Sequence, residues 1–244
     1  MNIEAQQITV GGLCVDVIRK PIKNLHLGVY PPHGRVRVAA PLSVSDDAVR
    51  LAVVTRMGWI KRQRAKFHAQ SRQSARAYVS GETHFFLGQR FRLNVIDDAN
   101  AGRVHLRNSR TLDLFVREGS DLAVRERVFV KWYRQELRCR AAPLIEKWAI
   151  VLDVPLPAWG IRRMKTKWGT CNIEAKRIWL NLELIKKPPQ CLDYIIVHEL
   201  AHFLERNHSD RYVALMDRHL PNWRMLRDEL NCEPLSHENW NVEN

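Results

Sequence analysis

The stretch that decides the fold is VHELAHFLERNH at residues 197–208, which places three histidines and a glutamate close together. On a helix, His198 and His202 are four residues apart and share one face, so their ring nitrogens can converge. Zinc takes nitrogen ligands at about 2.0–2.1 Å in a tetrahedral arrangement. Glu199 follows the first histidine and can reach a water on the metal without being a ligand. The spacing is therefore typical of an HExxH site, with two ligands and a general base.

His208 adds a third imidazole to this pattern. The intervening residues 203–207 can finish the helix and turn the chain back toward the metal. Three protein ligands leave the fourth position open, which is typical of a catalytic zinc site. The alternative is an ordinary helix that happens to carry histidines. The apolar residues around the motif favour the metal, because a buried His-Glu-His set without a ligand leaves polar groups in need of partners. The predicted cofactor is Zn²⁺.

The bulk composition predicts a soluble globular protein of the cytoplasm. The 244 residues are enough for one large domain or two small ones, and they can bury a core without disulfides. The five cysteines are scattered and form no CxxC pair, which favours a reducing compartment. The start of the chain has no signal-peptide pattern, and no apolar run is long enough to span a membrane.

The net charge of +13 is concentrated in residues 50–92, which hold ten Lys/Arg and one acid. Such a segment can contact phosphates, so weak polyanion or nucleic-acid association is one prediction. Lys61, Arg62 and Arg64 are its central cations. The alternative is a solvated basic face without a partner, because no recognised nucleic-acid motif accompanies the charge.

The pattern along the chain predicts an α+β fold. Alternating residues up to Pro41 predict strands, residues 43–67 a helix, and residues 83–117 strands again. A second long helix begins near Leu122, and two strand candidates follow at residues 160–172 and 176–185. Prolines then open the motif helix, which is expected to end at Asn207, and Ser209 caps another helix. We therefore expect a basic, strand-rich region over residues 1–119 and a metallohydrolase domain over residues 120–244.

The blocks WGTC at 168–171, HELAH at 198–202 and NHS at 207–209 resemble the YgjP-like metallopeptidase family. Similarity to that family extends over nearly the whole chain. Lys167 and Thr170 depart mildly from it, since arginine and serine are frequent there. The metzincin pattern fits less well, because Glu205 stands where that pattern has glycine.

The resemblance implies that His198, His202 and His208 are the ligands and Glu199 is the base. YgjP-like proteins are related to the WLM and SprT-like zinc proteases. The family's fold is a compact zincin, gluzincin-like, and we expect it here in the order helix, strand, strand, helix, helix.

Several neighbouring residues are candidates for supporting roles. Trp168 and Gly169 could line a cleft in which an extended peptide adds to a sheet edge; alternatively, they are a core anchor and a turn. Cys171 could block the metal as a fourth ligand, or could simply be buried. Second-shell carboxylates are expected to orient the histidines, with Asp210 and Asp217 as candidates. By proximity alone, the candidates for stabilising an oxyanion are Tyr194, Tyr212, His219 and Arg211.

The predicted function is a zinc-dependent hydrolase acting on a peptide or protein substrate. Glu199 would take a proton from the activated water and pass it to the leaving amine. One alternative is a nucleotide or phosphoanhydride hydrolase, favoured by nearby cations at positions Arg162, Arg163, Lys165 and Lys167. The other alternative is a nucleic-acid-associated protease that acts on DNA- or RNA-bound proteins.

Overall fold

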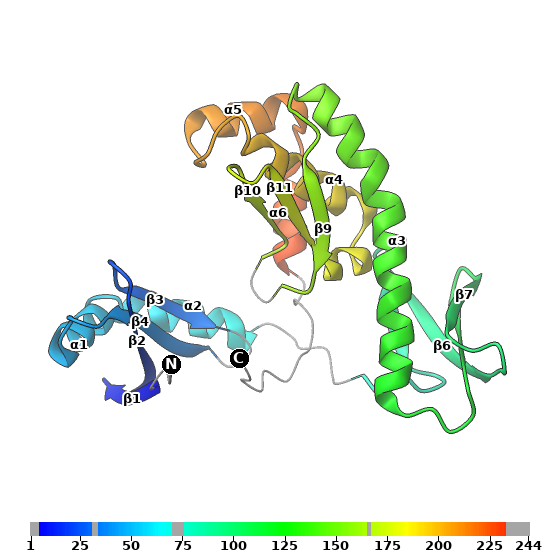
Figure 1. The fold of residues 1–244 in the computed structure, drawn as a ribbon, viewed down its shortest axis with the longest axis horizontal. Helices are drawn as coiled ribbons and strands as arrows, with labels where there is room; N and C mark the ends of the chain where they lie inside the picture. Colours follow the sequence, from blue (N-terminus) through cyan, green and yellow to red (C-terminus); the bar gives the residue numbers. More distant parts are fainter. Residues whose placement is uncertain (1–4, 31–33, 70–75, 165–166, 233–244) are drawn as a thin grey trace. The chain divides into compact units, whose positions relative to one another are not determined.

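The computed structural model describes residues 5–30, 34–69, 76–164 and 167–232, and the chain divides near residue 72 into two compact units (Figure 1). A domain boundary near residue 120 stays a prediction from the sequence. One continuous buried core runs from Tyr78 to Leu230 and includes the strands that precede residue 120. None of the described helices is long and apolar enough to cross a membrane.

The first unit is a four-stranded sheet with two helices. The sheet has the order β1-β2-β4-β3, with β2 and β4 parallel and the other pairs antiparallel. Alternate side chains such as Val15, Val36 and Val38 are buried, and they pack with Val49 and Ile60 from the helices. The elements of this unit are β1 Ala5–Val10, β2 Leu13–Lys20, β3 His26–Tyr30, β4 Arg35–Pro41, α1 Asp46–Thr55 and α2 Met57–Ala69.

Ser45 caps α1 by accepting a hydrogen bond from the Ala48 amide at 3.3 Å, as its position before two acids predicted. The helix expected over residues 43–67 is interrupted at Arg56, which separates α1 from α2. The basic segment 50–92 is also divided, because α2 belongs to the first unit and residues from 76 onward belong to the second. Association of the α2 cations Lys61, Arg62 and Arg64 with a polyanion stays a prediction.

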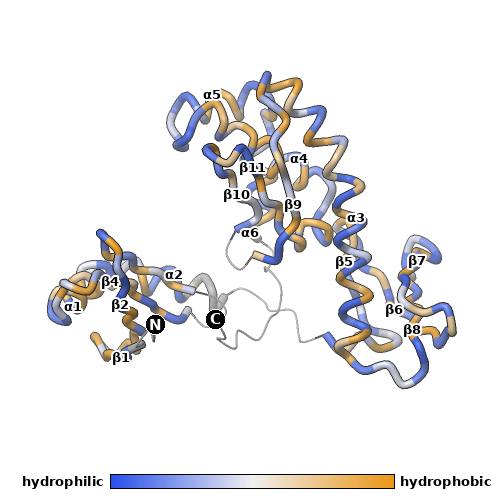
Figure 2. Tube along the Cα trace, in the orientation of Figure 1, coloured by the Kyte–Doolittle hydropathy of each residue, from blue (hydrophilic) through white to orange (hydrophobic). Residues whose placement is uncertain are grey.

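The second unit holds two sheets joined by one long helix. The first sheet has the order β5-β6-β8-β7 and the second the order β10-β11-β9. Helix α3 packs against β7 and β8 of the former and against α4, which lies under the latter (Figure 1). Apolar and polar stretches alternate along α3 in Figure 2, as expected for a helix with one buried side. The strands are β5 Thr83–Phe86, β6 Gln89–Asp97, β7 Arg103–Asn108, β8 Thr111–Val116, β9 Ala158–Arg162, β10 Gly169–Asn172 and β11 Arg177–Asn181.

Residues 120–232 depart in part from the predicted order of helix, strand, strand, helix, helix. The helices are α3 Leu122–Val151, the 3-10 turn η1 Leu182–Lys186, α4 Pro189–Ala201, α5 Asp210–His219 and α6 Trp223–Cys232. The described chain thus has three strands here, and α6 was not predicted. The strand pattern at 176–185 ends at Asn181, because its side chain accepts from the Glu183 amide and starts η1. The fold is a mixed α+β fold with several sheets, as predicted.

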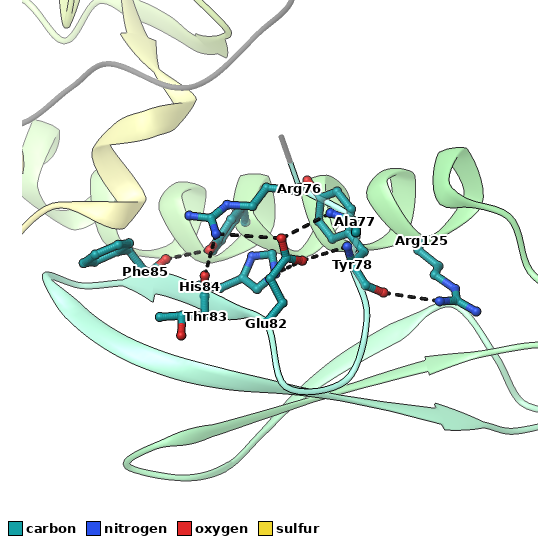
Figure 3. Close-up of polar contacts among 9 residues, drawn as sticks. Arg76, Ala77, Tyr78, Glu82, Thr83, His84, Phe85 and Arg125 are labelled. Atoms are coloured by element: carbon teal, nitrogen blue, oxygen red, sulfur yellow. Dashed lines mark hydrogen bonds and ion pairs between the residues drawn. The ribbon is translucent and has the colours of Figure 1, made fainter. Parts of the chain in front are cut away.

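A half-buried carboxylate, that of Glu82, fixes the start of the second unit (Figure 3). Glu82 accepts hydrogen bonds from the backbone amides of Ala77 at 3.1 Å and Tyr78 at 2.7 Å, and its Oε2 lies 3.1 Å from His84 Nε2. Arg76 donates to the Thr83 carbonyl at 2.8 Å. Burial lowers the pKa of His84 to about 4, so its imidazole is neutral near pH 7. Glu82 therefore satisfies the backbone groups that the entering chain would otherwise leave without partners.

Replacing Glu82 with glutamine is expected to lower the free energy of unfolding by about 1–3 kcal/mol, because the amide NH₂ of glutamine would face a backbone N–H donor. Urea denaturation measures the change. Glu118→Gln is the matched control, since that side chain is exposed. Equal stability of the two variants would contradict the anchoring role.

Candidate metal centre

Helix α4 is the buried floor of the candidate site. Pro189 stands in its first turn, where the missing amide costs nothing, and Pro188 precedes it as the N-cap. The helix contacts α3, α5, α6, β10 and β11, so nearly all its apolar residues are buried. The Trp148 indole donates to Asp193 at 2.8 Å and ties α4 to α3. These contacts fix the end of the helix that carries the motif.

Three histidines converge where α4 ends. His198 lies in the last turn of α4, His202 is its C-cap, and His208 lies just before α5. One candidate ligand atom from each lies within 4.8 Å of the other two. The Nε2 atoms of His198 and His208 are 3.3 Å apart. Tetrahedral ligation with bonds of about 2.1 Å separates two ligand atoms by about 3.4 Å, so the nitrogen set fits a zinc-sized ion.

The helix ends earlier than the sequence predicted. It was expected to continue to Asn207, but α4 ends at Ala201 and His202 is already the C-cap. The amides of Leu204 and Glu205 both bond to the Ala201 carbonyl and form the turn that follows. This early end gives the chain room to bring His208 back to His198.

Hydrogen bonds at Nδ1 fix the orientation of two of the rings. Tyr212 Oη lies 2.7 Å from His198 Nδ1 and donates to the His198 carbonyl at 3.2 Å. Because that proton is used, the hydroxyl oxygen accepts from Nδ1–H. His202 Nδ1 lies 3.2 Å from the Glu205 carbonyl, which can only accept. Both rings therefore present an Nε2 lone pair to the cluster, as metal-ligating histidines do.

The surroundings favour the neutral form of two of the histidines, His198 and His202. Burial, together with the neighbouring His202 and His208, lowers the pKa of His198 to about 3. Burial also lowers the pKa of His202. Neutral imidazoles are the form that binds metal. Burial raises the pKa of Glu199 to about 8, against the influence of Lys167.

The sequence of this chain matches a family of known metallopeptidases. A sequence model of the YgjP-like family, described as its metallopeptidase domain, matches residues 23–233. The chain belongs to the YgjP-like metallopeptidase family. Members of a metallopeptidase family use a metal ion, and the cluster of three histidines could bind one. No curated protein sequence matches the chain.

Two solved structures of archaeal metallopeptidase zymogens are similar to part of this YgjP-like chain. Abylysin of Pyrococcus abyssi is 21% identical with a TM-score of 0.35, covering 37% of this chain and 90% of its own. Jannalysin of Methanocaldococcus jannaschii is 21% identical with a TM-score of 0.34, covering 37% of this chain and 92% of its own.

A cavity of about 850 Å³ opens over the histidines in this YgjP-like chain. Its lining comes from β10, from α4 and the turn after it, and from α6, and includes Trp168, Gly169, Cys171 and Tyr194. Trp168 lines the cavity and also packs against the core, and its contact with a substrate stays a prediction. In the described part of the chain, β10 is an edge strand of its sheet.

Gly169 lies directly against Glu199. A Cβ atom at position 169 would stand 2.5 Å from Glu199 Oε1 and 2.8 Å from its Cγ. Any side chain there would push the carboxylate from its place. The contact between Gly169 and Glu199 depends on how β10 packs against α4. The sequence shows a glycine beside a tryptophan, but it cannot show this contact.

The structure reassigns the residues expected to orient the histidines. Asp217 is exposed and binds Arg224 and the Trp223 indole, and Asp210 is exposed in the first turn of α5. Neither has a hydrogen bond to the three imidazoles among the contacts of the described residues. Tyr212, a candidate oxyanion stabiliser by proximity alone, forms hydrogen bonds with His198 Nδ1 and with the His198 carbonyl. The signal in the sequence was limited to proximity, since Tyr212 follows His208 by four residues and lies in the first turn of α5.

The other candidates separate into those that line the cavity and those that do not. Tyr194 lines it, with its ring centroid 5.8 Å from that of His198. Cys171 also lines it but is not part of the cluster of described metal-binding groups, and burial raises its pKa to about 11. The cavity lining does not include Arg211 or His219.

Of the four basic candidates, Lys167 lines the cavity. Arg162 lies over the Trp179 ring at 3.4 Å, and Arg163 pairs with Glu126 at 3.0 Å. Lys165 lies outside the described residues.

Tyr212→Phe is expected to weaken zinc binding about 10- to 100-fold, the cost typical of losing a hydrogen bond to a metal-ligating histidine. Competition with a chromogenic chelator measures the affinity. Tyr194→Phe is the control, because Tyr194 also packs on His198 but forms no hydrogen bond with it among the described residues. Wild-type affinity in the Tyr212→Phe protein would remove this residue from the metal's support.

Proposed function

We propose that the chain is a zinc-dependent peptidase in which His198, His202 and His208 hold the metal and Glu199 is the general base. The observation that carries the proposal is the convergence of three imidazoles beside a buried carboxylate. The family assignment supports peptide hydrolysis as the reaction. Three nitrogen ligands support zinc, because zinc in catalytic sites takes three protein ligands and keeps one open position.

Zinc bound at the three histidines would supply Lewis-acid chemistry, activating a water molecule and polarising the substrate carbonyl. The protein's own part is proton transfer. Glu199 takes the proton of the attacking water on a carboxylate oxygen and delivers it to the leaving amine. A nearby cation favours the ionised carboxylate, so metal binding is expected to lower the raised pKa of Glu199.

The proposed substrate binds along edge strand β10. A peptide in extended conformation can bond to the free edge of β10 as an additional strand, which brings a scissile bond over the histidines. Trp168 and Gly169 lie at the start of this strand, and Gly169 permits close approach of the substrate backbone.

A phosphoanhydride hydrolase is the second candidate, favoured by cations that line the same cavity, Lys167 and Arg206. A panel of casein, peptides and nucleotides, each with and without chelator, separates the two functions. Chelator-sensitive cleavage of peptides alone supports the peptidase. Cleavage of nucleotides alone contradicts it.

Glu199→Gln is expected to keep zinc and lower peptide turnover about 10²–10⁴-fold, because an amide cannot accept the water's proton. Zinc content and turnover are measured on the same preparation. Asp210→Asn is the control, since it removes an exposed carboxylate two residues from His208. Unchanged turnover in zinc-loaded Glu199→Gln protein would refute the assigned base.

Gly169→Ala is expected to retain zinc but to lose turnover, because the new methyl group displaces the Glu199 carboxylate. The cause can be tested by a double-mutant cycle. In the Glu199→Gln background the alanine should cost almost nothing further. A full additional loss there would show that Gly169 acts on something other than Glu199.

A further inference from the structure

The charges that line the cavity are unbalanced. Three cations, Lys167, Arg206 and Arg227, face two carboxylates, Glu174 and Glu199. These cations come from three separate parts of the chain: the segment before β10, the turn after α4, and α6. Glu199 is buried, whereas Glu174 is exposed in the turn after β10. The open part of the cavity is therefore positive.

Two of these cations are available to a ligand. Lys167 and Arg206 are exposed, and neither forms an ion pair with a residue in the described ranges. Arg227 is different, because it pairs with Asp228 at 3.0 Å and lies 5.3 Å from the Trp223 ring centroid. The charge of Arg227 is already partly compensated, so we assign the selectivity for anionic ligands to Lys167 and Arg206.

Both free cations lie next to the reacting groups along the chain. Lys167 stands two residues before Gly169, which touches Glu199. Arg206 stands in the short loop that joins His202 to His208. A substrate placed along β10 would thus meet a cation on the β10 side and another on the loop side.

We propose that the cavity selects substrates that carry a carboxylate close to the scissile bond, with Lys167 and Arg206 as the residues that determine this specificity. The inference rests on the proposed peptidase function and names its substrate class. Unpaired cations in a cleft raise the local concentration of anionic ligands and disfavour cationic ones. The carboxylate can come from an Asp or Glu side chain or from the C-terminus of a peptide.

The test uses the full-length, zinc-loaded protein and peptides of one sequence. One pair carries Asp or Asn beside the scissile bond with both ends capped, and a second pair has neutral side chains with a free or amidated C-terminus. Each exposed ion pair contributes about two- to fivefold, so kcat/KM for the better acid should exceed that of its amide by about 4- to 25-fold. Whichever pair shows the ratio identifies the source of the carboxylate. The ratio should fall as salt is raised, since exposed charges are screened.

Arg206→Gln and Lys167→Gln should each reduce the acid-to-amide ratio about two- to fivefold. Arg218→Gln is the matched control, an exposed cation of α5 outside the cavity lining, and should leave the ratio unchanged. Equal hydrolysis of acid and amide peptides in both pairs would overturn the selectivity while leaving the peptidase intact.

Failure of the proposed function can be recognised separately. Glu199→Gln protein does not need to turn over, so its binding of the same labelled peptides, measured by fluorescence anisotropy, reports selectivity alone. Tighter binding of the acid peptides without any hydrolysis by the wild type would support the selectivity and refute the peptidase. Equal binding of acid and amide would refute the selectivity whatever the turnover.

Discussion

The hydrogen bond from His198 Nδ1 to Tyr212 joins the two helices on which the histidine cluster depends. Tyr212 is buried, and its ring stacks on His202 and meets His208 edge-on, so one side chain contacts all three imidazoles. Because the hydroxyl proton goes to the His198 carbonyl, the ring of His198 keeps its proton on Nδ1 and its lone pair on Nε2. Orientation and tautomer are thus fixed before any ligand arrives, which reduces the cost of binding one.

The rest of the second unit serves to hold this arrangement in place. Helix α4 can be buried on several sides because α3, α6 and the β10–β11 sheet cover it. Asn181 extends the support to the segment before β10, since its amide bonds to the carbonyls of Met164 and Lys167 at 2.8 Å each. Gly169, two residues after Lys167, contacts the Glu199 carboxylate. The Glu199 carboxylate is therefore held on helix α4 and is contacted by strand β10.

The sequence could predict the features that depend on local spacing. It could not predict those that depend on how elements far apart in the chain pack together. The shared face of His198 and His202 follows from the helical repeat, and the starts of α1 and α5 follow from Ser45 and Ser209. The role of Tyr212, the contact of Gly169 with Glu199 and the position of Arg206 depend on how separate elements meet. The sequence likewise could not show that the strands before residue 120 pack on α3 and share its buried core.

X-ray absorption at the zinc edge tests the proposed metal centre most directly, because it reports the ligand atoms and their distances without reference to activity. On the purified, zinc-loaded wild-type protein, the three-histidine centre predicts three imidazole nitrogens at about 2.0–2.1 Å and no sulfur. A sulfur ligand at about 2.3 Å, which would place Cys171 on the metal, or fewer than three imidazoles would contradict it.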